Sequence, residues 1–130
     1  MDKIMTINVR TLPPDTVEGH TGKVLMIPFT ASAQGEFFCG ETKGCCVDTQ
    51  YITPDGQFSL SARYILEGTD KDGNKCRIFI ENNGTSLENC KPRIITDSPA
   101  LAFLEKCELS AKVESTGGTV KIIVYAEQTR

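Results

Sequence analysis

Apolar and polar residues alternate along most of this chain, a period of two that is typical of β-strands with one buried face. The polar stretch 15–22, which holds His20, is predicted to be a loop. Pro28 cannot donate to a strand ladder, which predicts an edge or a bulge at that position. The segments predicted as strands are residues 4–10, 23–33, 36–40, 43–53, 58–69, 75–82, 108–114 and 119–126.

One short helix is predicted before the last two strands, because Ser98 can cap it, Pro99 suits its first position and residues 100–106 favour helix. Turn residues near positions 55, 72 and 83 leave room for strands of about ten residues, which suits sequential hairpins that curl and close. The sequence therefore predicts one all-β domain over residues 1–130. Its expected form is an antiparallel up-and-down barrel of about eight strands with one short helix, and the alternative is a two-sheet sandwich.

The register of the central hairpins can be predicted by counting from their turns. If residues 54–57 close the first hairpin, Asp48 lies opposite Arg63. If residues 70–74 close the second, Arg63 lies opposite Glu81. Cross-strand pairs of opposite charge stabilise a sheet by roughly 0.2–1 kcal/mol each, which favours this alignment. The same counting matches a further pair of opposite charge, Glu67 with Arg77.

The opposite face of these strands is predicted to be buried because it is almost entirely apolar. Tyr64 lies on this face, either as a core aromatic residue or as a contact that orients a ligand together with Asn82, which lies across from Ala62. The other residues of the predicted buried face are Phe58, Leu60, Leu66, Cys76, Ile78 and Ile80.

The charged row formed by Asp48, Arg63 and Glu81 is the candidate site. It is either a solvated ladder on the outer wall or part of the barrel interior, where Arg63 could bind a carboxylate or polar oxygen of a ligand. Arg63 would lower the pKa of the flanking carboxyl groups, which argues against their acting as general acids. The predicted ligand-binding residues are Asp48, Gln50, Arg63, Tyr64, Glu81 and Asn83.

Composition excludes several classes of protein. The net charge of −3 and the absence of a basic stripe argue against a nucleic-acid partner. Residues 1–9 alternate instead of forming an apolar signal segment, and no window is apolar enough for a membrane span, so we expect a cytoplasmic protein. Phosphate-loop, dinucleotide and Ser-His-Asp patterns are absent, so we expect no cofactor.

Six cysteines without a C-x-x-C pair, and a single histidine, do not match a zinc site. We therefore expect reduced thiols with structural roles and no bound metal. The adjacent Cys45 and Cys46, with Cys39, are the group for which a metal or redox role remains the alternative. Cys90 lies in a polar segment and is expected to be the most exposed.

The order of several short motifs resembles a bacterial family known as domain of unknown function 3237, or uncharacterised protein family 0311. The resemblance spans residues 3–127 and implies a lipocalin-like barrel without an activity. Cys45-Cys46-Val47-Asp48-Thr49 stands where the family has Gly-Gly-Ala-Asp-Trp, so the aromatic residue after Asp48 is missing. The matching motifs are residues 35–40, Gly44, residues 47–50, Asp55-Gly56, residues 61–64, Asp72-Gly73 and residues 92–94.

These observations favour a module that binds a small organic ligand in the barrel interior or mouth. A cofactor-free isomerase, cyclase or hydrolase that uses the same cavity is the second hypothesis, and a homo-oligomer without a ligand is the third. A binding module needs a cavity of roughly 300 Å³ or more. An enzyme needs in addition a group with a perturbed pKa, and an assembly protein needs a large apolar contact.

Overall fold

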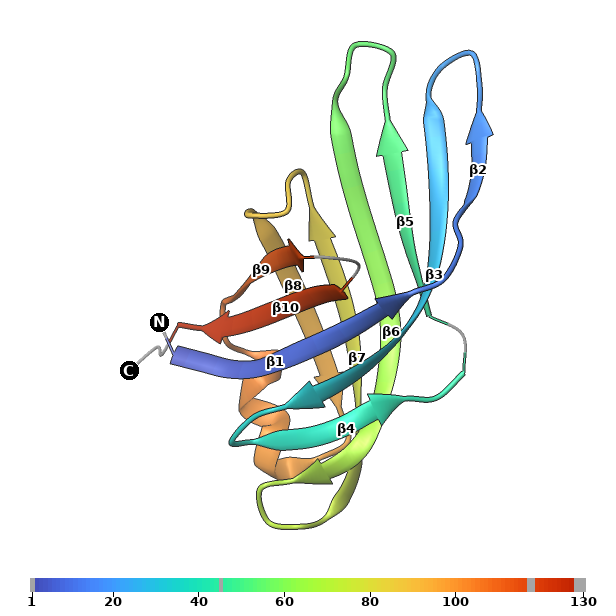
Figure 1. Ribbon diagram of the computed structural model, residues 1–130. Helices are drawn as coiled ribbons and strands as arrows, with labels where there is room; N and C mark the ends of the chain where they lie inside the picture. Colours follow the sequence, from blue (N-terminus) through green and yellow to red (C-terminus); the bar gives the residue numbers. More distant parts are fainter. Residues whose placement is uncertain (1, 45, 117–118, 128–130) are drawn as a thin grey trace.

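The strands of this protein follow one another around a closed antiparallel barrel, as Figure 1 shows for a computed structural model that describes residues 2–44, 46–116 and 119–127. The elements are β1 (Asp2–Thr11), β2 (Asp15–Glu18), β3 (Lys23–Gln34), β4 (Phe38–Thr42), β5 (Cys46–Ile52), β6 (Phe58–Asp70), β7 (Lys75–Gly84), β8 (Cys90–Thr96), the 3₁₀ helix η1 (Pro99–Glu105), β9 (Leu109–Thr116) and β10 (Thr119–Ala126).

The barrel closes because β1 pairs with β10 on one side and with β3 on the other. Strands β4 and β5 share one position between β3 and β6, and β2 lies outside the barrel on the free edge of β3. The wall therefore has eight strand positions in sequential order. The predicted antiparallel barrel with one short helix is confirmed, and closure leaves few exposed sheet edges.

The barrel wall is taller on one side than on the other. The strands β2 and β5, with the adjoining halves of β3 and β6, stand above the rest of the barrel, and we call this part the wing (Figure 1). Pro28 lies where β3 changes neighbours, since β2 pairs with residues 23–26 and β1 pairs from Phe29 onward. The Pro28 carbonyl accepts a hydrogen bond from the Leu12 N–H at 2.8 Å. The predicted irregularity at Pro28 is thus a point where β3 exchanges one neighbouring strand for another. Because of this exchange, the missing N–H of proline does not remove a hydrogen bond from the ladder.

Three local predictions are wrong. Residues 15–18 form β2, although the segment was expected to be a loop. Residues 90–96 form β8, which was not predicted, and Cys90 is 1% exposed instead of being the most exposed cysteine. Pro92 made this strand hard to predict, because proline has no N–H to donate to a strand ladder. It is tolerated here because β8 pairs with β7 at this position, while the described pairing of β8 with β9 is limited to Cys90.

The helix is confirmed as an element but not in its details. It is a 3₁₀ helix, and Ser98 makes no side-chain cap. The Ser98 hydroxyl instead donates to Asp70 Oδ2 at 2.9 Å, which ties the start of the helix to the end of β6. Leu101 and Leu104 are buried in the core, so η1 packs its apolar face against the barrel.

Inward-pointing residues fill the part of the barrel away from the wing. The predicted apolar face of β6 and β7 is buried, with Phe58 only partly so. The core is therefore concentrated at the end where η1 packs, and the cavity described below lies toward the wing. The largest fully buried apolar side chains are Met5, Ile7, Phe38, Leu66, Ile78, Ile80, Ile94, Leu101, Leu104 and Val124.

Candidate ligand cavity

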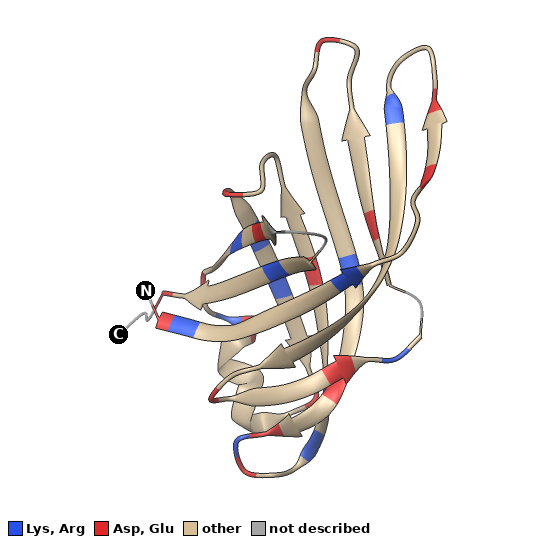
Figure 2. Ribbon diagram, viewed as in Figure 1, with Lys and Arg blue, Asp and Glu red and all other residues tan. Residues whose placement is uncertain are grey.

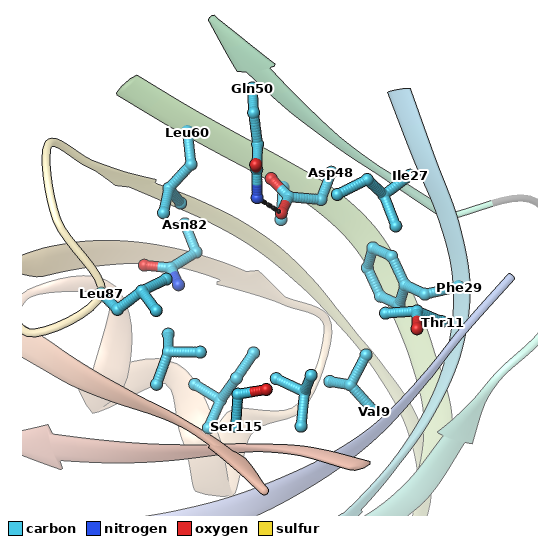
Figure 3. A pocket seen from close by; sticks show the side chains of 14 residues that line it. Val9, Thr11, Ile27, Phe29, Asp48, Gln50, Leu60, Asn82, Leu87 and Ser115 are labelled. Carbon is cyan, nitrogen blue, oxygen red and sulfur yellow. Dashed lines mark hydrogen bonds between the residues drawn. The ribbon is translucent and has the colours of Figure 1, made fainter. Parts of the chain in front are cut away.

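A cavity of about 210 Å³ lies inside the barrel at the wing end (Figure 3). This volume is below the roughly 300 Å³ expected for a drug-sized ligand, but an apolar cavity of about 150 Å³ can hold benzene. The cavity therefore suits a molecule with a single ring. Its wall is mainly apolar and includes Val9, Ile27, Phe29, Leu60, Leu87 and Ile122.

The carboxyl and amide side chains in this wall come from β5 and β7, and β1 and β9 add the hydroxyls of Thr11 and Ser115. Asp48 pairs with Ala62 on β6, and Ala62 pairs with Asn82 on β7, so the three residues form one inward-pointing row. The small side chain of Ala62 leaves open the space between Asp48 and Asn82. Gln50 lies two residues beyond Asp48 on the same face of β5, and Figure 3 shows these polar groups among the apolar side chains.

The predicted pairing of Asp48 with Arg63 is wrong by one residue. The first loop contains five residues instead of four, because Ile52 pairs with Phe58 and Thr53 belongs to the loop. The Thr53 N–H donates to the Gln57 carbonyl and the Thr53 hydroxyl accepts the Gln57 N–H, both at 2.9 Å. A slip of one residue moves a side chain to the other face of a sheet. Asp48 therefore points into the barrel while Arg63 points outward.

The Asp48 carboxyl group is only partly satisfied. Its Oδ2 accepts a hydrogen bond from Gln50 Nε2 at 2.9 Å, whereas its buried Oδ1 has no hydrogen-bond partner among the described residues. Burial raises the pKa of Asp48, and the hydrogen bond from Gln50 opposes this only in part. The lowered pKa that was expected beside Arg63 is wrong. The pKa of Asp48 is instead shifted upward, the direction in which the pKa of a carboxyl general acid is shifted.

Three further buried polar atoms lack partners within the described parts of the chain. Asn82 Oδ1 and Tyr64 Oη are on inward-pointing residues that are each 2% exposed, and Ser61 Oγ is on the outer face of β6. The Tyr64 ring packs edge-on against Phe29, with centroids 5.2 Å apart. Burial, and to a lesser extent the neighbouring Cys46 and Asp48, raises the pKa of Tyr64. An unsatisfied buried polar group costs about 1–3 kcal/mol, so each of these atoms calls for an explanation.

The amide nitrogen of Asn82 interacts with Cys90. Burial raises the pKa of the Cys90 thiol, and a hydrogen bond from Asn82 opposes this effect. Cys90 Sγ also donates to the Ser86 carbonyl at 3.3 Å. Because the amide nitrogen of Asn82 has this neighbour, its carbonyl oxygen is the atom left to accept a hydrogen bond from a ligand.

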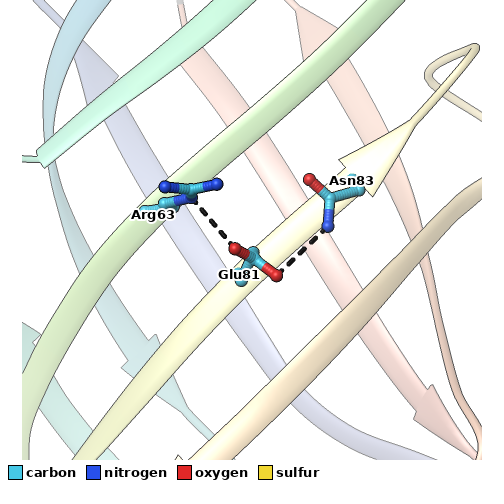
Figure 4. Close-up of polar contacts among 3 residues, drawn as sticks. All are labelled: Arg63, Glu81 and Asn83. Carbon is cyan, nitrogen blue, oxygen red and sulfur yellow. Dashed lines mark hydrogen bonds and ion pairs between the residues drawn. The ribbon is translucent and has the colours of Figure 1, made fainter.

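The remaining predicted site residues lie on the outer wall. Arg63 Nε pairs with Glu81 Oε2 at 2.9 Å, and Asn83 Nδ2 donates to Glu81 Oε1 at 3.4 Å (Figure 4). Arg93 lies opposite Glu81 on its other side, so the outer row is an acid between two bases. The predicted pairings of Arg63 with Glu81 and of Glu67 with Arg77 are confirmed. The expected row of Asp48, Arg63 and Glu81 is not.

The predicted ligand-binding residues are thus split between two faces. Asp48 and Gln50 line the cavity, Tyr64 is buried in the same interior, and Arg63, Glu81 and Asn83 face away from it. The cavity contacts of Leu87 and Phe29 were not predicted. Asn82 had a signal in the sequence, because it is the polar member of an inward series that otherwise runs Cys76, Ile78 and Ile80.

The charged residues do not gather into a patch of one sign. Figure 2 shows Lys and Arg positions interspersed with Asp and Glu over the strands and turns. No three His, Cys, Asp or Glu side chains come together as a metal site within residues 2–44, 46–116 and 119–127, and Cys45 lies outside these ranges. Among the described residues, no helix has the length and apolar character that a membrane crossing requires.

No protein-family model matches this sequence, and no curated protein matches it either. Similar folds occur among solved structures. A protein with unknown function from Clostridium acetobutylicum ATCC 824 is 22% identical, with 96% of this chain and 94% of that chain covered and a TM-score of 0.81. A beta-barrel like protein from Acinetobacter baumannii AYE is 17% identical, with coverage of 96% and 93% and a TM-score of 0.79.

An enzyme from Penicillium herquei is also similar in structure, with 12% identity, coverage of 97% of this chain and 92% of that chain, and a TM-score of 0.76. At such identities the likeness shows a shared fold and nothing about shared chemistry. The chain is therefore a small closed β-barrel protein, and its function must be argued from its own cavity.

Proposed function

We propose that this protein binds a small organic molecule in the cavity between Asp48 and Asn82. The observation that carries the proposal is a pair of buried acceptor atoms, Asp48 Oδ1 and Asn82 Oδ1, that have no partner in the described chain and belong to the same cavity wall. A few convergent polar groups in a mainly apolar cavity are typical of small-molecule sites.

The contrast with the outer wall supports this assignment. There, Arg63, Glu81 and Asn83 satisfy one another although water could replace each partner. Inside, where water competes least, the acceptors of Asp48 and Asn82 lack partners in the described chain; on the outer face only the Ser61 hydroxyl shares this state among the described residues. Leaving them so costs about 1–3 kcal/mol each, and a bound donor would recover that free energy. A purely structural interior would more readily use apolar residues at both positions.

The cavity has a route for entry at the wing end. Leu87, in the loop between β7 and β8, lines the cavity and is itself exposed. The Leu87 carbonyl accepts a hydrogen bond from the Val113 N–H at 2.9 Å, which holds this loop beside β9. A ligand that enters between the loop and the wing would reach Asp48 and Asn82 without opening the barrel wall.

The proposal can be tested by purifying the protein from its natural host and analysing the retained small molecules by mass spectrometry. Ala62→Leu places a larger side chain between Asp48 and Asn82 and should remove the retained molecule. Arg63→Ala, on the outer wall of the same strand, is the matched control and should retain it. The proposal fails if the retained molecules are the same in all three proteins, or if none is retained by the wild type.

A cofactor-free enzyme is the second candidate, and the state of Asp48 favours it. Burial raises the pKa of this carboxyl group beside a cavity, which is a common property of general acids and bases. The similarity to an enzyme from Penicillium herquei indicates that this type of barrel can carry catalysis. If the retained molecule is a substrate, the wild type should convert it over time in NMR spectra and Asp48→Asn should bind it without conversion.

A homo-oligomer remains the third candidate, and one surface supports it. Val17, Val24 and Tyr51 are cross-strand neighbours on the outer face of the wing, and Val17 and Tyr51 are exposed. If a second copy covers this face, Val17→Lys should lower the molecular mass measured by sedimentation. The cytoplasmic location and the resemblance to domain of unknown function 3237 stay predictions, and the barrel fold is compatible with that resemblance.

A further inference from the structure

The two buried atoms of the cavity wall that lack a partner are acceptors, whereas the Thr11 and Ser115 hydroxyls can donate or accept. Asp48 Oδ1 and Asn82 Oδ1 lack partners in the described chain, while Gln50 Nε2 is already engaged by Asp48 Oδ2. The described cavity wall includes no Lys, Arg or His side chain. A ligand that satisfies the two unpartnered atoms must therefore supply donors, and an anionic ligand would meet a carboxyl group with no compensating cation.

The spacing of the two acceptors limits the shape of the donor group. Asp48 and Asn82 are separated by one strand position, and neighbouring strands lie about 4.8 Å apart, so their Cα atoms are roughly 10 Å apart. Both side chains are short, and Ala62 between them adds little bulk. A ligand that occupies the space between these two residues can present N–H donors to the side chains of both.

The rest of the cavity selects for an apolar ring. Phe29 and Ile27 form one side of the wall, and Val120 and Ile122 of β10 belong to it as well. The volume of about 210 Å³ leaves room for one aromatic ring and a small substituent, because benzene is held by an apolar cavity of about 150 Å³. A fused ring system would be too large without movement of the Leu87 loop.

We infer that the ligand is a monocyclic cation whose N–H donors, on an amine or amidine group, satisfy the unpartnered acceptors of Asp48 and Asn82 while its ring packs against Phe29. This inference rests on the proposed ligand-binding function and names the chemical class of the ligand. It also replaces the expectation of a carboxylate bound by Arg63, because Arg63 is on the outer wall and Asp48 would repel such a ligand.

Benzamidine, benzamide and benzoate provide a direct test, since they have nearly the same shape and differ in charge and in hydrogen-bond donors. Binding is measured by calorimetry and mapped by backbone NMR shifts. Benzamidine should bind the wild type at least about 10-fold more tightly than benzamide and more tightly still than benzoate. Its shifts should map to β5, β6 and β7 at Asp48, Ala62 and Asn82.

Two variants locate the effect. Asp48→Asn should weaken benzamidine about 10–100-fold, as expected for loss of a charge-assisted hydrogen bond, and should change benzamide binding much less. Glu81→Gln removes a carboxylate from the outer wall and should leave the affinity for benzamidine unchanged. Equal weakening by both variants would mean that the cation responds to the net charge of −3 and would overturn the inference.

The outcomes separate this inference from the function on which it rests. If benzoate or benzamide binds the wild type as tightly as benzamidine, and Ala62→Leu abolishes that binding, the cavity is a ligand site but the inferred charge is wrong. If none of the three compounds causes shifts at the cavity, the inferred ligand class is wrong, and the proposed function is decided separately by the molecules that the wild type retains from its natural host. The comparison of compounds uses the wild-type protein, so it stands even if Asp48→Asn folds poorly.

Discussion

Replacing Asp48 by Asn should stabilise the barrel at neutral pH. The ionised carboxyl group has one hydrogen bond, from Gln50, and a buried oxygen with no partner in the described chain. An asparagine side chain has the same shape and its carbonyl can still accept the hydrogen bond from Gln50. Asparagine carries no charge, so the variant avoids the free-energy cost of burying an ionised carboxyl group.

The size of the effect follows from the unpaired oxygen. A buried polar group without a partner costs about 1–3 kcal/mol, and the lower end applies because Asp48 as a whole is only half-buried. We therefore expect a gain of about 1 kcal/mol in the free energy of unfolding at pH 7. For a chain of this length that corresponds to a rise in Tm of roughly 3–5 °C.

The pH dependence provides a sharper signature. The pKa of Asp48 is raised above its ordinary value of 3.8 in the folded protein, so the folded state holds the proton more tightly than the unfolded state. The stabilisation from this proton is present below pH 3.8 and is lost as the pH rises through the folded pKa. The advantage of Asp48→Asn should therefore be largest at pH 7 and should shrink as the pH falls.

Urea unfolding at a series of pH values tests this prediction, with each variant compared with the wild type at the same pH. Glu81→Gln is the matched control, because it removes a carboxylate from the outer face of β7, two strands from Asp48, and should change stability by less than about 1 kcal/mol. The reasoning is refuted if Asp48→Asn lowers the stability at pH 7, or if its effect is independent of pH.

Three further variants test other parts of the structure. Arg63→Ala should cost less than about 1 kcal/mol in urea unfolding, because the Arg63 side chain is 67% exposed and its ion pair is solvated; a larger loss would mean that the outer row is structural. A Cβ atom on Gly68 would lie 1.9 Å from the Cys39 carbonyl oxygen, so Gly68→Ala should cost about 3 kcal/mol or more or prevent folding, and a near-neutral result would contradict the β4–β6 pairing. Burial alone would raise the pKa of Asp70, but hydrogen bonds from Ser98, Asn74 and Asp72 hold this pKa below 3.8. The ionised Asp70 carboxylate therefore stabilises the folded protein above pH 3.8, and this stabilisation is lost as the pH falls through the folded pKa. Asp70→Asn should therefore destabilise the protein at pH 7 and less so in acid, and equal melting curves at neutral pH would disprove this role.

The barrel could be predicted because local patterns carry most of the information that it needs. Alternation in β6 and β7 places one face in the core, and residues 70–74 close their hairpin with the expected register between Arg63 and Glu81. The predicted register of the first hairpin is wrong by one residue, because Thr53 belongs to the loop and makes two hydrogen bonds with Gln57. That choice depends on local geometry that the residue pattern does not show.

The cavity could be predicted only in part. Of the candidate residues, Asp48 and Gln50 line the cavity and Tyr64 is buried in the interior, but the face of Asp48 depends on the register that was wrong. Contacts from β9, β10 and the Leu87 loop arise when β1 closes the barrel between β3 and β10. Such contacts join segments that are far apart in the chain, so no local alternation pattern indicates them.

The most direct test of a ligand site between Asp48 and Asn82 is a crystal structure, at high resolution, of protein purified from its natural host. We predict electron density for a molecule with one ring against Phe29, with donors within hydrogen-bond distance of Asp48 Oδ1 and Asn82 Oδ1. Ordered water alone bridging these two oxygens, or a cavity filled by Leu87, would contradict the account.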